Sequence, residues 1–124
     1  MSYTIMNNID YKVGIYIRLS REDEEKEKYQ ESESIGNQRT LLMQYIKENK
    51  LNFISEYVDD GVSGTSFDRP AFNRMIADIE ASKINMVVTK DLSRLGRNYV
   101  QSGLYIETYF PEHEVRFVAI LDNI

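Results

Sequence analysis

Residues 11–18 read Tyr-Lys-Val-Gly-Ile-Tyr-Ile-Arg, and this stretch decides the fold. Its β-branched and aromatic residues predict a buried strand with a basic end. Arg18 continues that strand, where an unpaired charge is costly and needs a partner. The partner is an internal carboxylate such as Asp60 or an external phosphate. Both can apply in turn, the carboxylate before a phosphate binds and the phosphate afterwards.

Further strands and helices alternate along the rest of the chain. Strands are predicted over residues 52–58, 84–89 and 115–121. One helix is predicted to begin at Ser34 and a second at Arg69-Pro70. A third helix is predicted over residues 98–110, and Pro111 is predicted to end it. This order predicts an α/β fold: a mainly parallel sheet of four to five strands with helices on both faces. Functional side chains would then gather at the carboxyl ends of the strands.

The composition fits one domain over residues 11–124, preceded by a polar tail over residues 1–10. The chain has no Cys, which excludes disulfides and thiolate metal sites and fits a reducing, cytoplasmic location. No signal peptide and no apolar run long enough to span a membrane is present. The net charge is -5, but residues 21–33 hold seven acids and three bases, so the other 111 residues carry only -1. Residues 21–33 are also predicted to be mobile, because they have little apolar surface to bury.

Four arginines and a serine follow the predicted strands and form the candidate site. These residues are Arg18, Ser20, Arg69, Arg94 and Arg97. The arginines can surround one phosphate, because a guanidinium donates two parallel hydrogen bonds to phosphate oxygens and keeps its charge. Ser20 supplies a hydroxyl that can attack the phosphate.

Other chemistries are weaker alternatives. A Ser-His-Asp triad is disfavoured because His113, the sole histidine, lies between two glutamates in a predicted turn. Carboxylates at strand ends, here Asp59, Asp60 and Asp91, can hold Mg²⁺ in a nuclease or topoisomerase-like domain. A turn with an arginine partner explains the Asp59-Asp60 pair more simply. A third alternative is a binding module that assembles with partners and cleaves nothing.

The sequence resembles the serine recombinases, the resolvase/invertase family, from about Tyr11 to its end. The nucleophile motif Y-x-R-x-S, the helix motif S-x-x-x-Q, the block D-x-x-S-G-x-x-x-x-R and the block ending R-x-x-R are all matched. The matching residues are Tyr16, Arg18, Ser20; Ser34, Gln38; Asp60, Ser63, Gly64, Arg69; and Arg94, Arg97.

The resemblance implies a site-specific recombinase in which Ser20 attacks a scissile DNA phosphate and forms a phosphoserine link to the 5′ end. Arg18, Arg69, Arg94 and Arg97 would stabilise the charge on the pentacoordinate phosphate, and Gln38 and Asp60 would orient groups. Tyr16 and Ser63 would join the arginines in binding DNA. No cofactor or metal is implied, because covalent capture conserves the bond energy, and no residue stands out as the general base.

One departure concerns the third block. Small resolvases have Asp directly before the first Arg, whereas this chain has Ser93 there and an acid at Asp91. The spelling K-D-L-S-R-L-G-R resembles the large, transposon-type branch. The resemblance also implies that a dimerisation helix and DNA-binding domains lie outside this chain, that the full-length protein forms a dimer or tetramer on DNA, away from membranes, and that residues 1–124 alone are inactive.

Overall fold

The computed structural model describes residues 10–19, 35–60, 69–96 and 99–124. Its sheet consists of β1 (Lys12–Leu19), β2 (Asn52–Asp60), β3 (Met86–Thr89) and β4 (Arg116–Ala119), in the order β2-β1-β3-β4. All three neighbouring pairs are parallel. The predicted parallel sheet is therefore confirmed, and the carboxyl ends of its strands share one edge.

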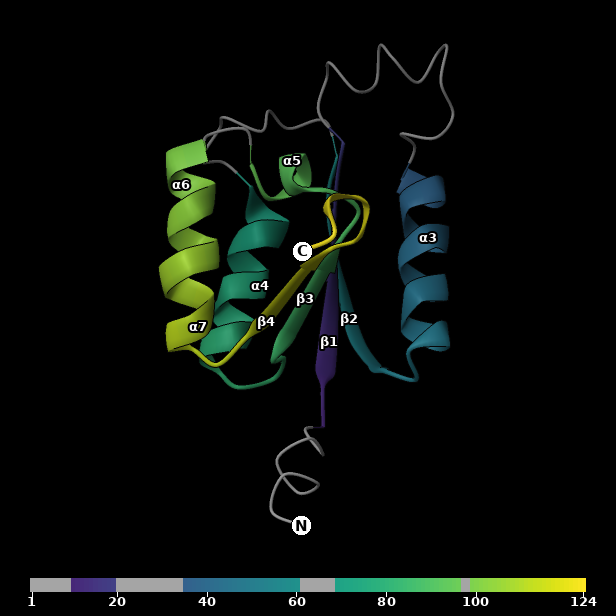
Figure 1. The fold of residues 1–124 in the computed structure, drawn as a ribbon, viewed down its shortest axis with the longest axis horizontal. Coiled ribbons are helices and arrows are strands. Elements are labelled where there is room, and N and C mark those ends of the chain that lie inside the picture. The colour runs from purple at the N-terminus through teal and green to yellow at the C-terminus, as the bar shows by residue number, and fades with distance from the viewer. Residues whose placement is uncertain (1–9, 20–34, 61–68, 97–98) are drawn as a thin grey trace.

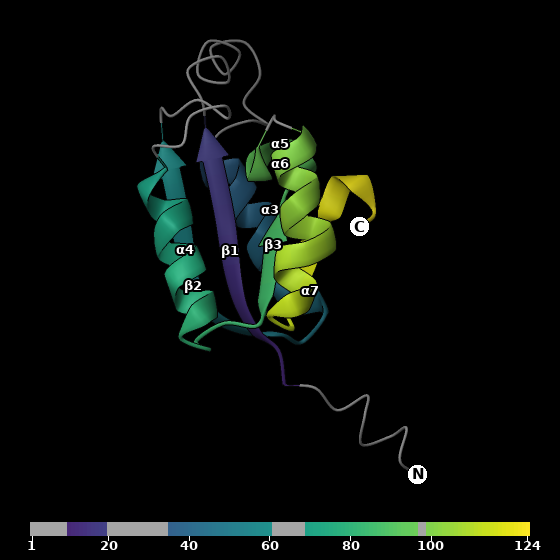
Figure 2. The same cartoon turned by 90° about the vertical axis from the view of Figure 1, so that its left-hand side faces the viewer.

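Helices cover both faces of the sheet, as predicted (Figure 1). One face carries α3 (Ile35–Glu48). The other carries α4 (Pro70–Glu80) and a longer helical segment made of α6 (Tyr99–Leu104), the π-helical η2 (Tyr105–Tyr109) and α7 (Phe110–Glu112). Figure 2 looks onto this second face, with α4 and α6 in front of β1 and α3 behind it.

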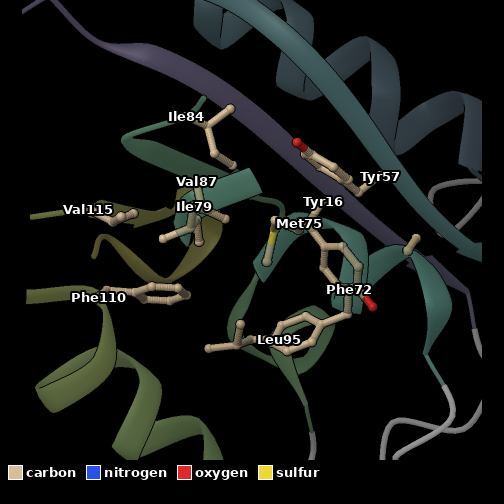
Figure 3. Packing of buried hydrophobic residues seen from close by; sticks show 11 residues of the cluster. Tyr16, Tyr57, Phe72, Met75, Ile79, Ile84, Val87, Leu95, Phe110 and Val115 are labelled. Carbon is tan, nitrogen blue, oxygen red and sulfur yellow. The ribbon is translucent and has the colours of Figure 1, made fainter. Parts of the chain in front are cut away.

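Two hydrophobic clusters separate these layers. The aliphatic cluster, between the sheet and α3, consists of Val13, Ile15, Ile17, Leu42, Ile46, Met86, Val88 and Val118. The aromatic cluster, on the α4 face, consists of Tyr16, Tyr57, Ala71, Phe72, Met75, Ile79, Ile84, Val87, Leu95, Phe110 and Val115 (Figure 3). The strand period of two sends alternate β1 residues into different clusters, so both sides of this central strand are buried.

The end of the last helical segment differs from the prediction. Pro111 does not stop the helix before it but lies within α7, which continues to Glu112. Proline lacks the N–H of an α-helical bond and clashes with the carbonyl four residues earlier. The π-helical turn directly before Pro111 lets the segment continue, because its wider spacing changes which groups are paired.

Two elements near the carboxyl edge were missed by the sequence pattern. A four-residue helix, α5 (Leu92–Leu95), follows β3, and a 3-10 turn, η3 (Ile120–Asp122), ends the strand predicted to reach residue 121. β4 pairs with β3 only as far as Thr89↔Ala119, because the chain after Thr89 turns away into α5. Elements this short contain too few residues to show a period. None of the described helices is long and apolar enough to cross a membrane.

Candidate active site

Arg18 lies at the carboxyl end of β1 with no solvent exposure. Its Nε donates to the carbonyl of Arg94 at 3.3 Å, and its Nη2 donates to the carbonyl of Ser93 at 2.5 Å. Both carbonyls belong to α5, so the guanidinium bridges β1 and the segment that follows β3. The predicted acidic partner, Asp60, is exposed, and the acid opposite Arg18 in the β1–β2 register is Asp59.

Arg94 in turn donates a hydrogen bond to the backbone of β1. Its Nη1 donates to the carbonyl of Arg18 at 2.9 Å, so each of these two arginines holds the backbone of the other. Gln38, which is buried on α3, donates from Nε2 to the same Arg18 carbonyl at 3.2 Å. This carbonyl lies two residues before Ser20 in the sequence. Gln38 and Arg94 therefore fix the backbone that leads to Ser20.

Arg69 comes from a third segment, the residue directly before α4. Its Nη1 donates to the carbonyl of Leu95 at 2.5 Å, and its guanidinium lies 4.1 Å from the centroid of the Phe72 ring. The structure thus brings Arg18, Arg69 and Arg94 together at α5.

Asp59 is buried at the same edge and accepts three hydrogen bonds. They come from the Tyr16 hydroxyl at 2.8 Å and from the backbone N–H groups of Ala71 at 2.9 Å and Phe72 at 3.0 Å. Burial raises the pKa of Tyr16 well above its usual range, and Asp59 adds to this while Arg69 and Arg18 oppose it. Tyr16 has no solvent exposure and its hydroxyl is bonded to Asp59, and a direct contact of Tyr16 with DNA stays a prediction.

Asp91 places an acid beside Arg94, although the residue directly before Arg94 is Ser93 and not the Asp of small resolvases. The Ser93 hydroxyl donates to Asp91 Oδ1 at 2.5 Å, and Arg94 Nε lies 3.5 Å from the same oxygen. Asp122 is an addition from the structure: its Oδ2 accepts from the N–H of Leu92 at 2.6 Å and ties α5 to η3. No sequence signal links Asp122 to α5, because the two residues are 30 positions apart.

The described part of the site holds several buried cationic side chains. Among the described residues, the buried charged side chains are four cations and one carboxylate: Arg18, Arg69, Lys90, Arg94 and Asp59. Lys90, which directly follows β3, was not among the predicted site residues. Guanidinium groups that meet at one edge of the sheet can bind an anion there. A phosphate fits, because guanidinium N–H groups bond charged oxygens more strongly than peptide carbonyls.

Several predicted residues lie outside the described residues: Ser20, Ser34, Ser63, Gly64, Arg97 and the segment 21–33. Two of the three acids proposed for Mg²⁺ are bonded to other groups, Asp59 to Tyr16 and α4 and Asp91 to Ser93, and the third, Asp60, is exposed. Within the described ranges, no three His, Cys, Asp or Glu side chains are grouped as metal ligands. His113 follows α7, at the opposite end of the sheet from α5 (Figure 1).

A family model and a curated relative both match this chain, and both describe recombinases. Residues 13–124 match the family model of the resolvase N-terminal domain. The chain is 33% identical over 108 residues to a candidate DNA recombinase of Bacillus subtilis (strain 168), with 87% of this chain and 20% of that protein covered. The chain therefore spans about a fifth of that relative's length.

Two solved structures share the fold. The N-terminal catalytic domain of TP901-1 integrase superposes with a TM-score of 0.78 at 28% identity, covering 91% of this chain and 79% of that chain. A resolvase family site-specific recombinase from Streptococcus pneumoniae gives a TM-score of 0.73 at 27% identity, covering 92% of this chain and 74% of that chain.

Proposed function

The chain belongs to the resolvase N-terminal domain family, and we propose that it is the catalytic domain of a serine recombinase that cuts and rejoins DNA at specific sites. One observation carries this proposal: three buried arginines from three separate segments meet beside the backbone that leads to Ser20. Such an arrangement suits a phosphate that gains negative charge as a hydroxyl attacks it.

In the proposed reaction, the Ser20 oxygen attacks the phosphorus of a scissile phosphodiester. The Ser20 hydroxyl gives up its proton as the bond between its oxygen and phosphorus forms. The bond between phosphorus and the 3′ oxygen breaks, and this oxygen takes up a proton to become the 3′ hydroxyl. The 5′ end stays joined to Ser20. Attack of a 3′ hydroxyl on the phosphoserine reverses the step and reseals the DNA, so the bond energy is conserved without a nucleotide cofactor.

The site residues have different tasks in this proposal. Arg18, Arg69 and Arg94, with Arg97 from the same sequence block, would donate to the phosphate oxygens as charge develops on them. Gln38 acts as a positioning residue, since it bonds the Arg18 carbonyl rather than a surface group. Asp60 and Ser63 would contact or orient groups near the DNA. The proton acceptor for Ser20 is not assigned.

DNA is the partner in this proposal, which places the protein in the cytoplasm with the chromosome. The full-length protein is proposed to act as a dimer or tetramer, so that broken ends can exchange partners. Segments beyond residues 1–124 would supply dimerisation and DNA recognition, and this chain alone would bind DNA weakly and cleave none.

Capture of a covalent adduct tests the proposed function. The full-length protein is incubated with a randomised pool of nicked DNA duplexes, and protein-linked DNA is recovered under denaturing conditions and sequenced. We expect an adduct on a defined sequence that also forms in EDTA, and none from Ser20→Ala. An undiminished adduct in Ser20→Ala would move the nucleophile to another residue, with Ser63→Ala as the next variant. Loss of cleavage in EDTA would instead favour a metal-dependent nuclease.

A further inference from the structure

Helix α4 begins with a residue that cannot cap it. Its N-cap is Arg69, whose carbonyl accepts from the N–H of Asn73 at 3.0 Å. Ser, Thr, Asp and Asn are preferred at this position because their side-chain oxygens accept from the exposed N–H groups of the first turn. An arginine side chain has no acceptor. The sequence therefore places a cation where a local cap would normally be.

Asp59 supplies the missing cap from β2. Its Oδ1 accepts from Ala71 N–H at 2.9 Å and its Oδ2 from Phe72 N–H at 3.0 Å. Pro70 has no N–H to satisfy, so this carboxylate completes the bonding of the first turn. A carboxylate is also favoured there by the helix dipole. The cap thus comes from a strand residue 12 positions before Ala71 in the sequence.

Tyr16 joins this cap to β1. Its hydroxyl donates to Asp59 Oδ2 at 2.8 Å, and its ring packs edge-on against Phe72 with 5.5 Å between the centroids (Figure 3). Phe72 in turn carries the Arg69 guanidinium on its face at 4.1 Å. Tyr16, Asp59, Phe72 and Arg69 therefore form a continuous set of contacts that runs from the strand of Arg18 to Arg69.

We propose that Asp59, assisted by Tyr16, is a positioning residue that holds Arg69 in register with Arg18 at the scissile phosphate without itself touching DNA. The inference rests on the proposed function for the phosphate and on the observed contacts for the positioning. The arrangement explains why the α4 N-cap is an arginine: the chain gives up the local cap to place a cation at the strand edge, and a distant carboxylate restores the helix end.

Two variants separate the members of this set. Asp59→Asn keeps the shape but turns one of its two oxygens into an N–H donor that faces the donors of α4. Tyr16→Phe removes one hydroxyl and keeps the ring on Phe72. The matched control is Tyr57→Phe, because the Tyr57 hydroxyl donates to Asp78 Oδ2 at 2.6 Å within the same aromatic cluster, away from the strand ends.

The first measurement is the single-turnover rate of adduct formation by the full-length protein. Its substrate, at saturating concentration, is a DNA duplex with the sequence identified by adduct capture. We expect Asp59→Asn to lower the rate roughly 10²-fold with little change in DNA affinity, because a small misplacement of a catalytic group is costly. Tyr16→Phe should lose less, and the double variant should lose no more than Asp59→Asn alone. Tyr57→Phe should match the wild type.

A substrate with a methylphosphonate at the scissile position adds a readout that a mere loss of folding would not change. This group is neutral, so it depends less on a correctly placed guanidinium. The ratio of the wild-type rate to the Asp59→Asn rate should be smaller on the methylphosphonate substrate than on the normal substrate. The ratio of the wild-type rate to the Arg69→Ala rate should be smaller as well. An equal ratio on both substrates would overturn the inference.

The second measurement needs no DNA and separates failure of the inference from failure of the proposed function. In residues 1–124, solvent exchange of the Arg69 guanidinium N–H groups, one of which donates to the Leu95 carbonyl, is followed by nitrogen-15 NMR. We expect faster exchange in Asp59→Asn and Tyr16→Phe and no change in Tyr57→Phe. Unchanged exchange in the first two variants would overturn the positioning role, whereas an absent adduct in the wild type would count against the recombinase proposal alone.

Discussion

The two faces of β1 bury their residues equally well but use them differently. On the α3 side, Val13, Ile15 and Ile17 enter the aliphatic cluster, where packing depends on volume. On the α4 side, Tyr16 and Arg18 take part in specific polar contacts with Asp59 and α5. One strand therefore serves as a scaffold on one side and as a functional edge on the other, and substitutions should separate the two.

The largest expected effects are on the functional side. Arg18→Ala, Arg69→Ala and Arg94→Ala should each slow adduct formation by ~10²–10³, because each removes a donor to the charge that develops on phosphate. DNA affinity should fall far less, since this charge is present only in the transition state.

The control for these variants is Arg39→Ala, which removes an exposed arginine paired with Glu56 on the outer surface. It should leave the rate unchanged and alter stability by less than ~1 kcal/mol. Single-turnover kinetics and gel shifts measure rate and affinity. Equal losses of rate and of DNA affinity would show that the three arginines only bind DNA. The α4 side of β1 would then have no special role in the reaction compared with the α3 side.

The next effect is on the scaffold side. Leu42→Ala should lower the free energy of unfolding by ~2–5 kcal/mol, because Leu42 is completely buried in the aliphatic cluster and its loss leaves a cavity. Urea denaturation measures this loss. Adduct formation should be unchanged at a temperature where the variant stays folded, and a large rate loss in the folded variant would show that packing in the aliphatic cluster also serves catalysis.

A smaller effect is expected at Gly14, where β1 meets the aromatic cluster. A Cβ added there would lie 2.8 Å from Ile84 Cδ1 and 2.9 Å from Tyr57 Cε2. Gly14→Ala should therefore destabilise the fold by ~1–3 kcal/mol through overpacking. Gly36→Ala, on α3 with no atom within 4 Å of the added Cβ, should instead stabilise by up to ~1 kcal/mol. Thermal denaturation compares the two, and equal effects would contradict the tight packing at Gly14.

The smallest effect concerns a polar contact of the aromatic cluster away from the strand ends. Tyr57→Phe should cost about 1 kcal/mol at neutral pH, because it removes the bond to the partly exposed Asp78. Burial raises the pKa of Tyr57 to about 12, above the value of about 10 expected in the unfolded chain.

The pH dependence follows from this shift. The unfolded chain ionises Tyr57 before the folded protein does, so the contribution of Tyr57 to stability is complete below about pH 10 and is lost as the pH rises through about 12. Wild type should therefore lose stability faster than Tyr57→Phe over this range in urea titrations. Parallel curves would show that Tyr57 ionises alike in both states.

Much of this fold could be predicted from local patterns in the chain. β-Branched and aromatic residues predicted β1, Arg69-Pro70 marked the beginning of α4, and the order of elements implied the parallel sheet. The arginines of the site could be recognised because each lies at the end of a strand, follows a strand or opens a helix. Less could be predicted near the edge itself, where α5 and η3 are too short to show a period.

By itself the sequence determined which residues reach the carboxyl edge of the sheet, because strand and helix periods are local properties of the chain. Only the tertiary structure decided how those residues are joined: that Arg18 and Arg94 hold each other's carbonyls, and that Asp59 rather than Asp60 turns inward to cap α4. These contacts join segments far apart in sequence. They depend on strand register and on the height of each helix against the sheet, which are set when the layers pack together.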